Sequence, residues 1–229
     1  MKLSILMPVY NEEERVANAL KQALDVDYPC DIEVVVVNDG SRDSTGEVLS
    51  RLDDPRIRVI THPRNQGKGA AIKTAVDNAA GEYMVILDAD LEYDPQDIPR
   101  LLQPVLDGHA EVVYGNRTFG NHSAYSFWYV IGNKAVTTAA NVLFNSYIGD
   151  LETCFKLMPV SMYRGLAIKS RGFGMEAEVT GKLLRQRIRP YEVPISYRAR
   201  SREEGKKITW RDGVEAVWIL TRERMRRRR

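Results

Sequence analysis

Apolar and polar positions alternate along the first half of the chain in blocks that predict strands followed by helices. Short apolar or β-branched runs predict strands at residues 3–9, 32–37, 57–60, 83–87 and 112–114. Helices are expected after each of the first four strands, around residues 12–24, 45–52, 67–79 and from Pro95 onward. This alternation predicts an α/β fold with a mostly parallel sheet covered by helices on both faces. Ligands of such sheets bind at the carboxyl ends of the strands.

The start of the first helix carries a local signature. Asn11 precedes the helix, and Glu14 stands three residues later, which is the spacing of a capping box. Val16, Leu20 and Leu24 then supply an apolar stripe. The pattern predicts that Asn11 caps this helix.

The second half of the chain begins with a different pattern. Residues 119–148 are crowded with aromatic and aliphatic side chains, which predicts an insertion of amphipathic helices. Such helices suit a membrane interface, a buried lid or an oligomer contact. Strands are expected again at residues 154–158 and 191–197, with a helix at 176–187 between them. A last helix is expected from residue 210 to the end, with Val214, Val217 and Trp218 on one face.

Length and composition limit the class of protein. The 229 residues, 44% hydrophobic and 28% charged, fit one globular domain and exclude a disordered or fibrous chain. Two cysteines without a Cys/His cluster make a disulfide framework or a structural zinc site improbable and favour a reducing compartment. The first residues do not form a signal peptide, and no apolar run is long enough to span a bilayer, so membrane contact is expected to be peripheral.

The net charge of +2 conceals an uneven distribution. Residues 197–229 hold 12 Lys and Arg against 5 Asp and Glu, a net charge of +7, which leaves −5 on the rest of the chain. A basic end suits nucleic acid, anionic lipid or a phosphate-bearing substrate, or is simply a solvated helix end. Because the chain has no known nucleic-acid-binding module, no nucleic-acid partner is expected.

Carboxylates cluster after the fourth predicted strand. Asp88 and Asp90 lie two residues apart and therefore point the same way, and Glu92 extends the set. Oxygen ligands favour a hard cation such as Mg²⁺ or Mn²⁺, which is normally shared with a diphosphate. An isolated Asp-x-Asp is common, but its place at a strand end strengthens the prediction of a metal site.

Polar residues also follow the first two strands. Tyr10 and Glu12 after the first strand and Asp39 after the second could contact a nucleotide base or ribose, although a helix cap and a turn would explain Asn11 and Asp39 separately. Gly67-Lys68-Gly69 lacks the context of a P-loop, and no GxGxxG follows the first strand, so those glycines indicate close packing of a helix on the sheet.

These motifs together resemble a known family. Pro8-Val9-Tyr10-Asn11-Glu12, Val37-Asn38-Asp39-Gly40-Ser41, Asn65 with Gly67 and Gly69, and Asp88-Ala89-Asp90 are similar, in order and spacing, to the nucleotide-sugar half of family-two glycosyltransferases of GT-A fold. The resemblance covers about the first 117 residues, and Gly115-Asn116-Arg117 stands where relatives often have Gly-Ser-Arg.

The second half resembles one branch of that family. The segments 150–156, Phe173-Gly174-Met175-Glu176 and 197–208 are similar to dolichyl-phosphate mannose synthase and related polyprenyl-phosphate glycosyltransferases. The resemblance implies transfer of mannose or glucose from GDP-mannose or UDP-glucose to a polyprenyl monophosphate, on the cytoplasmic face of the membrane. It also implies a nucleotide-sugar half at 1–117, an acceptor half at 118–209 with interface helices near 121–148, and a basic helix at 210–229.

The resemblance assigns roles residue by residue. Nucleotide contacts fall on Pro8, Tyr10, Glu12, Asp39, Asn65, Lys68, Asp88 and Ala89. Metal ligands are Asp88, Asp90 and Glu92, where Glu92 replaces the Gln of relatives. The catalytic set is Asp90, Asp150, Arg117 and Arg200; the acceptor phosphate falls to Arg117, Arg200 and Lys206, and acceptor positioning to Glu176.

The acceptor determines which chemistry is needed. A lipid monophosphate is already an anion near neutral pH and needs charge screening rather than a strong base. A saccharide or protein hydroxyl would need a base, for which Asp150 is the candidate, although Asp150 also suits a cap or turn. A nucleotide-sugar-binding, membrane-recruiting protein without catalysis is the alternative of a different class.

Overall fold

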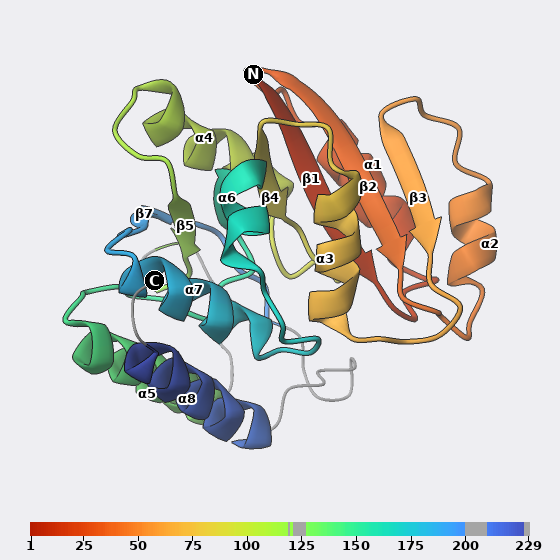
Figure 1. Cartoon of the computed structure of the whole chain (residues 1–229). Coiled ribbons are helices and arrows are strands. Elements are labelled where there is room, and N and C mark those ends of the chain that lie inside the picture. The colour runs from red at the N-terminus through yellow and green to blue at the C-terminus, as the bar shows by residue number, and fades with distance from the viewer. Residues whose placement is uncertain (119, 121–126, 200–209, 227–229) are drawn as a thin grey trace.

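The computed structural model describes residues 1–118, 120, 127–199 and 210–226, and within them one mixed sheet forms the centre of the molecule (Figure 1). Its seven strands in these ranges follow the order β3-β2-β1-β4-β6-β5-β7. The strands are β1 (Lys2–Val9), β2 (Asp31–Asn38), β3 (Ile57–Thr61), β4 (Tyr83–Ile86), β5 (Val113–Asn116), β6 (Lys156–Pro159) and β7 (Tyr191–Pro194). Strands β1 to β4 pair in parallel and β6 is antiparallel to both neighbours, so the expected mostly parallel α/β sheet is confirmed.

Helices cover both faces of this sheet. They are α1 (Val16–Leu24), α2 (Thr45–Ser50), α3 (Lys68–Asn78), η1 (Pro95–Asp97), α4 (Ile98–Leu106), α5 (Phe127–Phe144), α6 (Val160–Leu166), α7 (Met175–Arg185) and α8 (Trp210–Met225). In Figure 1, α3, α6 and α7 lie in front of the sheet and α1 lies behind it. Helices α5 and α8 lie together below α7, and each of these three contacts the other two.

The burial of β2 explains its central place. Val34, Val35, Val36 and Val37 are fully buried, because helices cover both faces of this strand. The main core joins the strands to α1, α3, α4, α6 and α7. A smaller core fills the space between α5, α7 and α8; its buried members are Val136, Ala140, Ile148, Leu151, Ala177, Leu184, Ala216, Ile219 and Leu220.

The predicted cap at Asn11 is wrong. Helix α1 begins at Val16, and no side chain caps it. Asn11 instead adopts a left-handed conformation with φ of 54°, which asparagine tolerates better than most residues. Its side-chain oxygen accepts from the N–H of Arg42 at 2.9 Å, and its own N–H donates to Ser41 Oγ at 3.0 Å. The residue therefore ties the β1 loop to the β2 loop.

The apolar stretch at 119–148 contains one helix in its described part, α5, where several were expected. Helix α6 was not expected at all, because seven residues directly after a strand ending in Pro159 give too short a periodic pattern. Among the described helices, none combines the length and the hydropathy that crossing a bilayer requires. Cys30 and Cys154 are free thiols, as expected.

Candidate active site

The carboxyl ends of β2, β1 and β4 lie side by side in the sheet, which brings the polar segments after these strands to one edge. Hydrogen bonds donated by backbone N–H groups join two of these segments. The N–H of Glu12 donates to Thr45 Oγ1 at 2.9 Å, and the N–H of Asp39 donates to the Val9 carbonyl at 2.8 Å. The expected convergence of strand-end residues at one edge is therefore confirmed for the segments that carry Tyr10, Glu12 and Asp39.

Asp39 organises the loop before α3. Its buried carboxylate accepts the N–H of Gln66 at 2.9 Å and the N–H of Gly67 at 2.8 Å. His62 Nδ1 lies 2.7 Å from the same carboxylate, and His62 Nε2 lies 2.9 Å from Thr74 Oγ1 of α3. His62 is thus a structural partner of Asp39 that the sequence did not single out. Asn65 is exposed in the loop that these contacts shape.

Gly67 and Gly69 allow a close approach at the start of α3. Gly67 has φ of +96°, and a Cβ on it would lie 2.5 Å from the carbonyl oxygen of Arg171. A Cβ on Gly69 would lie 2.3 Å from the carbonyl oxygen of Ser170. Close packing was expected, but the partner is the segment before α7 and not the sheet.

A chain of alternating charges runs from the strand edge into the interior. Lys68 Nζ lies 2.8 Å from Asp88 Oδ2 and 3.4 Å from Glu176 Oε1. Lys156 Nζ lies 2.8 Å from Glu176 Oε2. We call these four residues, Asp88, Lys68, Glu176 and Lys156, the charge chain. Burial opposes the charge of Lys68, but the neighbouring Asp88 and Glu176 carboxylates outweigh it and raise the pKa of Lys68 well above its usual value.

Lys156 is the deepest member of the charge chain. It has no solvent exposure, and its ammonium group also donates to the carbonyl oxygens of Leu151, at 2.9 Å, and of Thr153. It lies 4.8 Å from the ring centre of Tyr114. Glu176, predicted to position the acceptor, lies between two lysines instead of at the surface, and its predicted role stays a prediction.

The three predicted metal ligands differ from one another in solvent exposure. Asp88 and Asp90 are partly exposed after β4, and the N–H of Glu92 donates to Asp90 Oδ1 at 3.0 Å. Glu92 is buried, and its carboxylate accepts the hydroxyl of Tyr197 at 2.5 Å. Within the described ranges no group of three or more His, Cys, Asp or Glu side chains is arranged to hold a metal ion. The roles of all three residues stay predictions.

The partly exposed Arg117 and the fully buried Asp150 form an ion pair next to this edge. Arg117 Nε donates to Asp150 Oδ2 at 2.6 Å, and a terminal nitrogen donates to Oδ1 at 2.8 Å. The guanidinium carbon lies 5.0 Å from the ring centre of Tyr197. Burial would raise the pKa of Asp150, but the charge and hydrogen bonds of Arg117, with a hydrogen bond from Asn133, lower it below its usual value.

This ion pair bears on the role of Asp150 as a general base. A base is most effective when its pKa lies near the working pH, whereas the pKa of Asp150 is lowered and both its oxygens are bound by Arg117. The geometry therefore disfavours proton abstraction by Asp150. Arg200 and Lys206, predicted to contact the acceptor phosphate, lie outside the described residues.

The sequence model of glycosyl transferase family 2 matches residues 4–166, which include most of β1, all of β2 to β6 and the site residues from Tyr10 to Lys156. The chain belongs to glycosyl transferase family 2. The expectation drawn from the strand-end motifs is thereby confirmed at the level of the family.

Curated members of glycosyl transferase family 2 align with much of this chain. Undecaprenyl-phosphate 4-deoxy-4-formamido-L-arabinose transferase of Pseudomonas syringae is 35% identical over 152 residues, which are 63% of this chain and 44% of the relative. Dolichol-phosphate mannosyltransferase of Pyrococcus furiosus is 26% identical over 211 residues, or 90% of this chain and 59% of the relative. The chain thus spans about half of the length of these relatives.

Solved structures share the fold at low identity. Glucosyl-3-phosphoglycerate synthase from Mycobacterium tuberculosis in complex with UDP has a TM-score of 0.71 and 18% identity, covering 97% of this chain and 80% of that chain. A mannosyltransferase from Pyrobaculum calidifontis in complex with GDP-Man and Mn²⁺ has a TM-score of 0.63 and 21% identity, covering 86% and 56%. The expected GT-A fold of a family 2 glycosyltransferase is confirmed.

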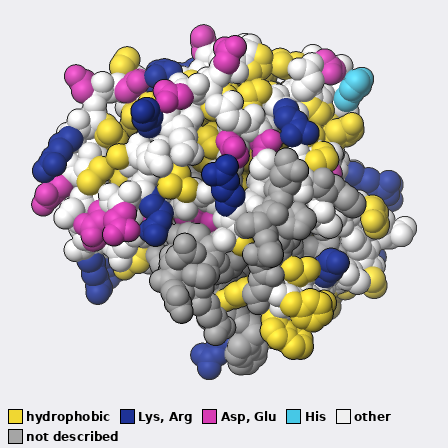
Figure 2. Space-filling view, turned by 180° about the vertical axis from the view of Figure 1, so that it is seen from behind, with side chains coloured by type: hydrophobic (Ala, Val, Ile, Leu, Met, Phe, Trp, Pro, Cys, Tyr) yellow, Lys and Arg dark blue, Asp and Glu magenta, His cyan; other side chains and the backbone are white. Residues whose placement is uncertain are grey.

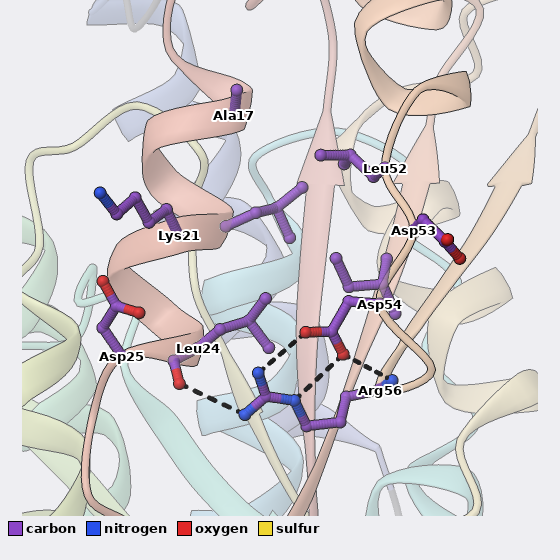
Figure 3. A pocket seen from close by; sticks show the side chains of 10 residues that line it. Ala17, Lys21, Leu24, Asp25, Leu52, Asp53, Asp54 and Arg56 are labelled. Carbon is purple, nitrogen blue, oxygen red and sulfur yellow. Dashed lines mark hydrogen bonds and ion pairs between the residues drawn. The ribbon is translucent and has the colours of Figure 1, made fainter.

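A surface pocket of about 260 Å³ lies elsewhere in this family 2 domain. Figure 3 shows it between α1 and the segment before β3, away from the strand ends that carry Asp39 and Asp88. At its rim the Arg56 guanidinium is bound by Asp54 and donates to the Leu24 carbonyl at 3.3 Å. The pocket is lined by none of the strand-end residues of the candidate site.

Glu152 is a site residue whose role the sequence did not indicate, although it lies in the quoted 150–156 motif. Burial, the neighbouring Glu176 carboxylate and the Asp150 carboxylate raise the pKa of Glu152 to about 7. The charges that act on Glu152 come both from the charge chain, through Glu176 and Lys156, and from the Arg117–Asp150 ion pair.

Proposed function

We propose that this protein transfers one sugar, mannose or glucose, from GDP-mannose or UDP-glucose to a polyprenyl or dolichyl monophosphate at the cytoplasmic face of a membrane. The nucleotide-sugar half is residues 1–117, the acceptor half is 118–209 and the basic C-terminal segment is 210–229, of which α8 covers Trp210–Met225. An oxygen of the lipid phosphate attacks the anomeric carbon, the bond from this carbon to the nucleoside diphosphate breaks, and the configuration inverts.

The observation that carries the proposal is the Arg117–Asp150 ion pair. It leaves Asp150 with a lowered pKa, unsuited to remove a proton from a hydroxyl acceptor. The Arg117 guanidinium also lies over the ring of Tyr197, whose hydroxyl binds Glu92. A phosphate acceptor needs no such base and does need a cation. Arg117 supplies that cation, and the names of the two curated relatives, which act on undecaprenyl phosphate and dolichol phosphate, support the same acceptor class.

The residues present fit a divalent cation, Mg²⁺ or Mn²⁺. Magnesium sites of this kind use one or two carboxylates and complete the shell with substrate phosphates and water. Asp88 and Asp90 supply two partly exposed carboxylates at the strand edge, so a third protein ligand is not required. Bound there, the ion would screen the charge of the donor diphosphate. Lys68 Nζ lies 2.8 Å from Asp88 Oδ2 and would help to hold that carboxylate.

The outer face of α5 and α8 fits a membrane surface. Phe127, Trp128, Val214 and Trp218 are exposed, and the Arg222 guanidinium lies 4.8 Å from the ring centre of Trp218. Figure 2 shows hydrophobic side chains gathered at the lower right, the side on which α5 and α8 lie. Aromatic side chains beside arginine suit the boundary of an anionic bilayer.

The test is a transfer assay with radiolabelled nucleotide sugars, polyprenyl phosphate in vesicles and Mn²⁺. We expect lipid-soluble product with one of the two donors, its loss on chelation, and its loss in Asp90→Asn without a change in thermal unfolding. Label on a saccharide or protein hydroxyl, and none in lipid, would favour the hydroxyl acceptor. Donor binding without any transfer would favour the non-catalytic, membrane-recruiting alternative.

A further inference from the structure

Two polar side chains on the inner face of α5 bind the segment that carries Asp150. Asn133 Nδ2 donates to Asp150 Oδ1 at 3.0 Å. One turn further, the Thr137 hydroxyl lies 3.4 Å from Asn133 Oδ1 and accepts the N–H of Leu151 at 3.2 Å. Because a carboxylate can only accept, the Asn133 amide must present its nitrogen to Asp150 and its oxygen to Thr137.

Asp150 is fixed from three sides. Glu192 of β7 holds its backbone, because its carboxylate accepts the N–H of Gly149 at 2.8 Å and of Asp150 at 3.3 Å. Arg117 binds both carboxylate oxygens. Among the described residues, Asn133 is the one group besides Arg117 that donates an observed hydrogen bond to this fully buried carboxylate. The orientation of the carboxylate, and with it the position of the guanidinium, therefore depends on α5.

We propose that Asn133 is a positioning residue that fixes the Asp150 carboxylate and thereby places the Arg117 guanidinium for the acceptor phosphate. This inference rests on the proposed function, in which Arg117 contacts that phosphate. In this role Asn133 acts through Asp150, to which its amide donates. Its loss should thus weaken acceptor binding and leave donor binding in place, because the side-chain hydrogen bonds of Asn133 in the described part of the chain run to Asp150 and Thr137.

The packing of α5 does not depend on Asn133. The apolar side chains that α5 buries against α7 and α8 are Val136 and Ala140, which a change at 133 leaves intact. The opposite face of α5 carries the exposed Trp128 and Ile131. One helix thus has the proposed membrane surface on one side and Asn133, which binds Asp150, on the other.

The experiment compares Asn133→Ala and Asn133→Asp with the wild type in the vesicle assay, measuring kcat and KM for each substrate. For Asn133→Ala we expect the acceptor KM to rise about tenfold, the effect of one hydrogen bond to a charged group, with the donor KM within about twofold. Asn18→Ala, an exposed helical asparagine on α1, is the control and should match the wild type.

Asn133→Asp gives a second, independent readout. It places a carboxylate beside Asp150, whose other charged neighbours are Arg117, Glu152 and Glu192. We expect a larger rise in the acceptor KM at about pH 8 than at about pH 6, because Asp150 keeps its charge over this range and protonation of the carboxyl group introduced at position 133 relieves the repulsion. A structural defect would instead lower kcat at every pH.

The outcomes separate the two proposals. A wild-type protein that makes lipid product, with an acceptor KM unchanged in both variants, overturns the role of Asn133 and leaves the proposed function standing. Equal rises in the donor KM and the acceptor KM also overturn the role of Asn133. A wild-type protein that makes no lipid product under any condition overturns the proposed function and this inference together.

Discussion

Replacing Lys156 with methionine removes the deepest charge of the charge chain while keeping a similar side-chain volume. Glu176 would then retain only Lys68, at 3.4 Å, as an observed cationic partner in the described residues, and the carbonyl oxygens of Leu151 and Thr153 would lose their donor. Breaking a buried ion pair from one side typically destabilises a protein by about 3–5 kcal/mol. For a domain of this size each kcal/mol lowers Tm by about 2–4 °C, which gives an expected loss of about 6–20 °C.

The assay is thermal unfolding, with urea unfolding as an independent measure. Lys73→Met is the matched control, because Lys73 forms an exposed ion pair with Asp77 and its loss should cost less than about 1 kcal/mol. Lys156→Met/Glu176→Gln should be more stable than Lys156→Met alone, since the uncompensated carboxylate is gone. The reasoning is refuted if Lys156→Met unfolds like Lys73→Met, or if the double variant is less stable than the single one.

Three further changes have defined outcomes. Gly69→Ala should destabilise the fold by about 1–3 kcal/mol in urea unfolding and weaken donor binding, because its Cβ would lie 2.3 Å from the Ser170 carbonyl oxygen; unaltered unfolding would contradict this contact. Burial and neighbouring carboxylates raise the pKa of Glu152 to about 7, so just below that pH the folded state holds a proton that the unfolded chain has lost. The free energy of unfolding should therefore fall as the pH rises from about 5 to about 8, and Glu152→Gln should flatten this slope. Trp128→Ser combined with Trp218→Ser, at side chains 78% and 59% exposed, should weaken sedimentation with anionic vesicles about tenfold without lowering Tm; unchanged sedimentation would exclude this face from membrane contact.

The strands of the first half were predictable because their signal is local. A run such as 34–37 is β-branched and buried on both faces, which its sequence already indicates. The insertion of β6 between β4 and β5, antiparallel to both, was not predictable, since it depends on pairing between residues about 40 to 75 positions apart. Asn11 shows the same limit: its capping pattern is local, but its observed contacts are to Ser41 and Arg42, which lie 30 and 31 positions further along the chain.

The residues of the candidate site that follow strands could be predicted. The residues whose partners lie far away in the sequence could not. Asp39 and Asp88 stand at strand ends and were placed correctly at the edge. His62, Glu152 and Asn133 contribute through burial and through contacts made across the fold, and nothing in their local sequence distinguishes them from ordinary polar positions.

The charge chain also limits how this protein can be recombined with its relatives. Lys68 and Asp88 come from the first 117 residues, whereas Lys156 and Glu176 come from β6 and α7, so the ion pairs cross the boundary between the proposed donor and acceptor halves. A chimera that joins this donor half to an acceptor half lacking the Lys156–Glu176 pair would leave Lys68 buried beside a single carboxylate. Exchanges meant to alter acceptor choice should therefore transfer all four residues as one unit.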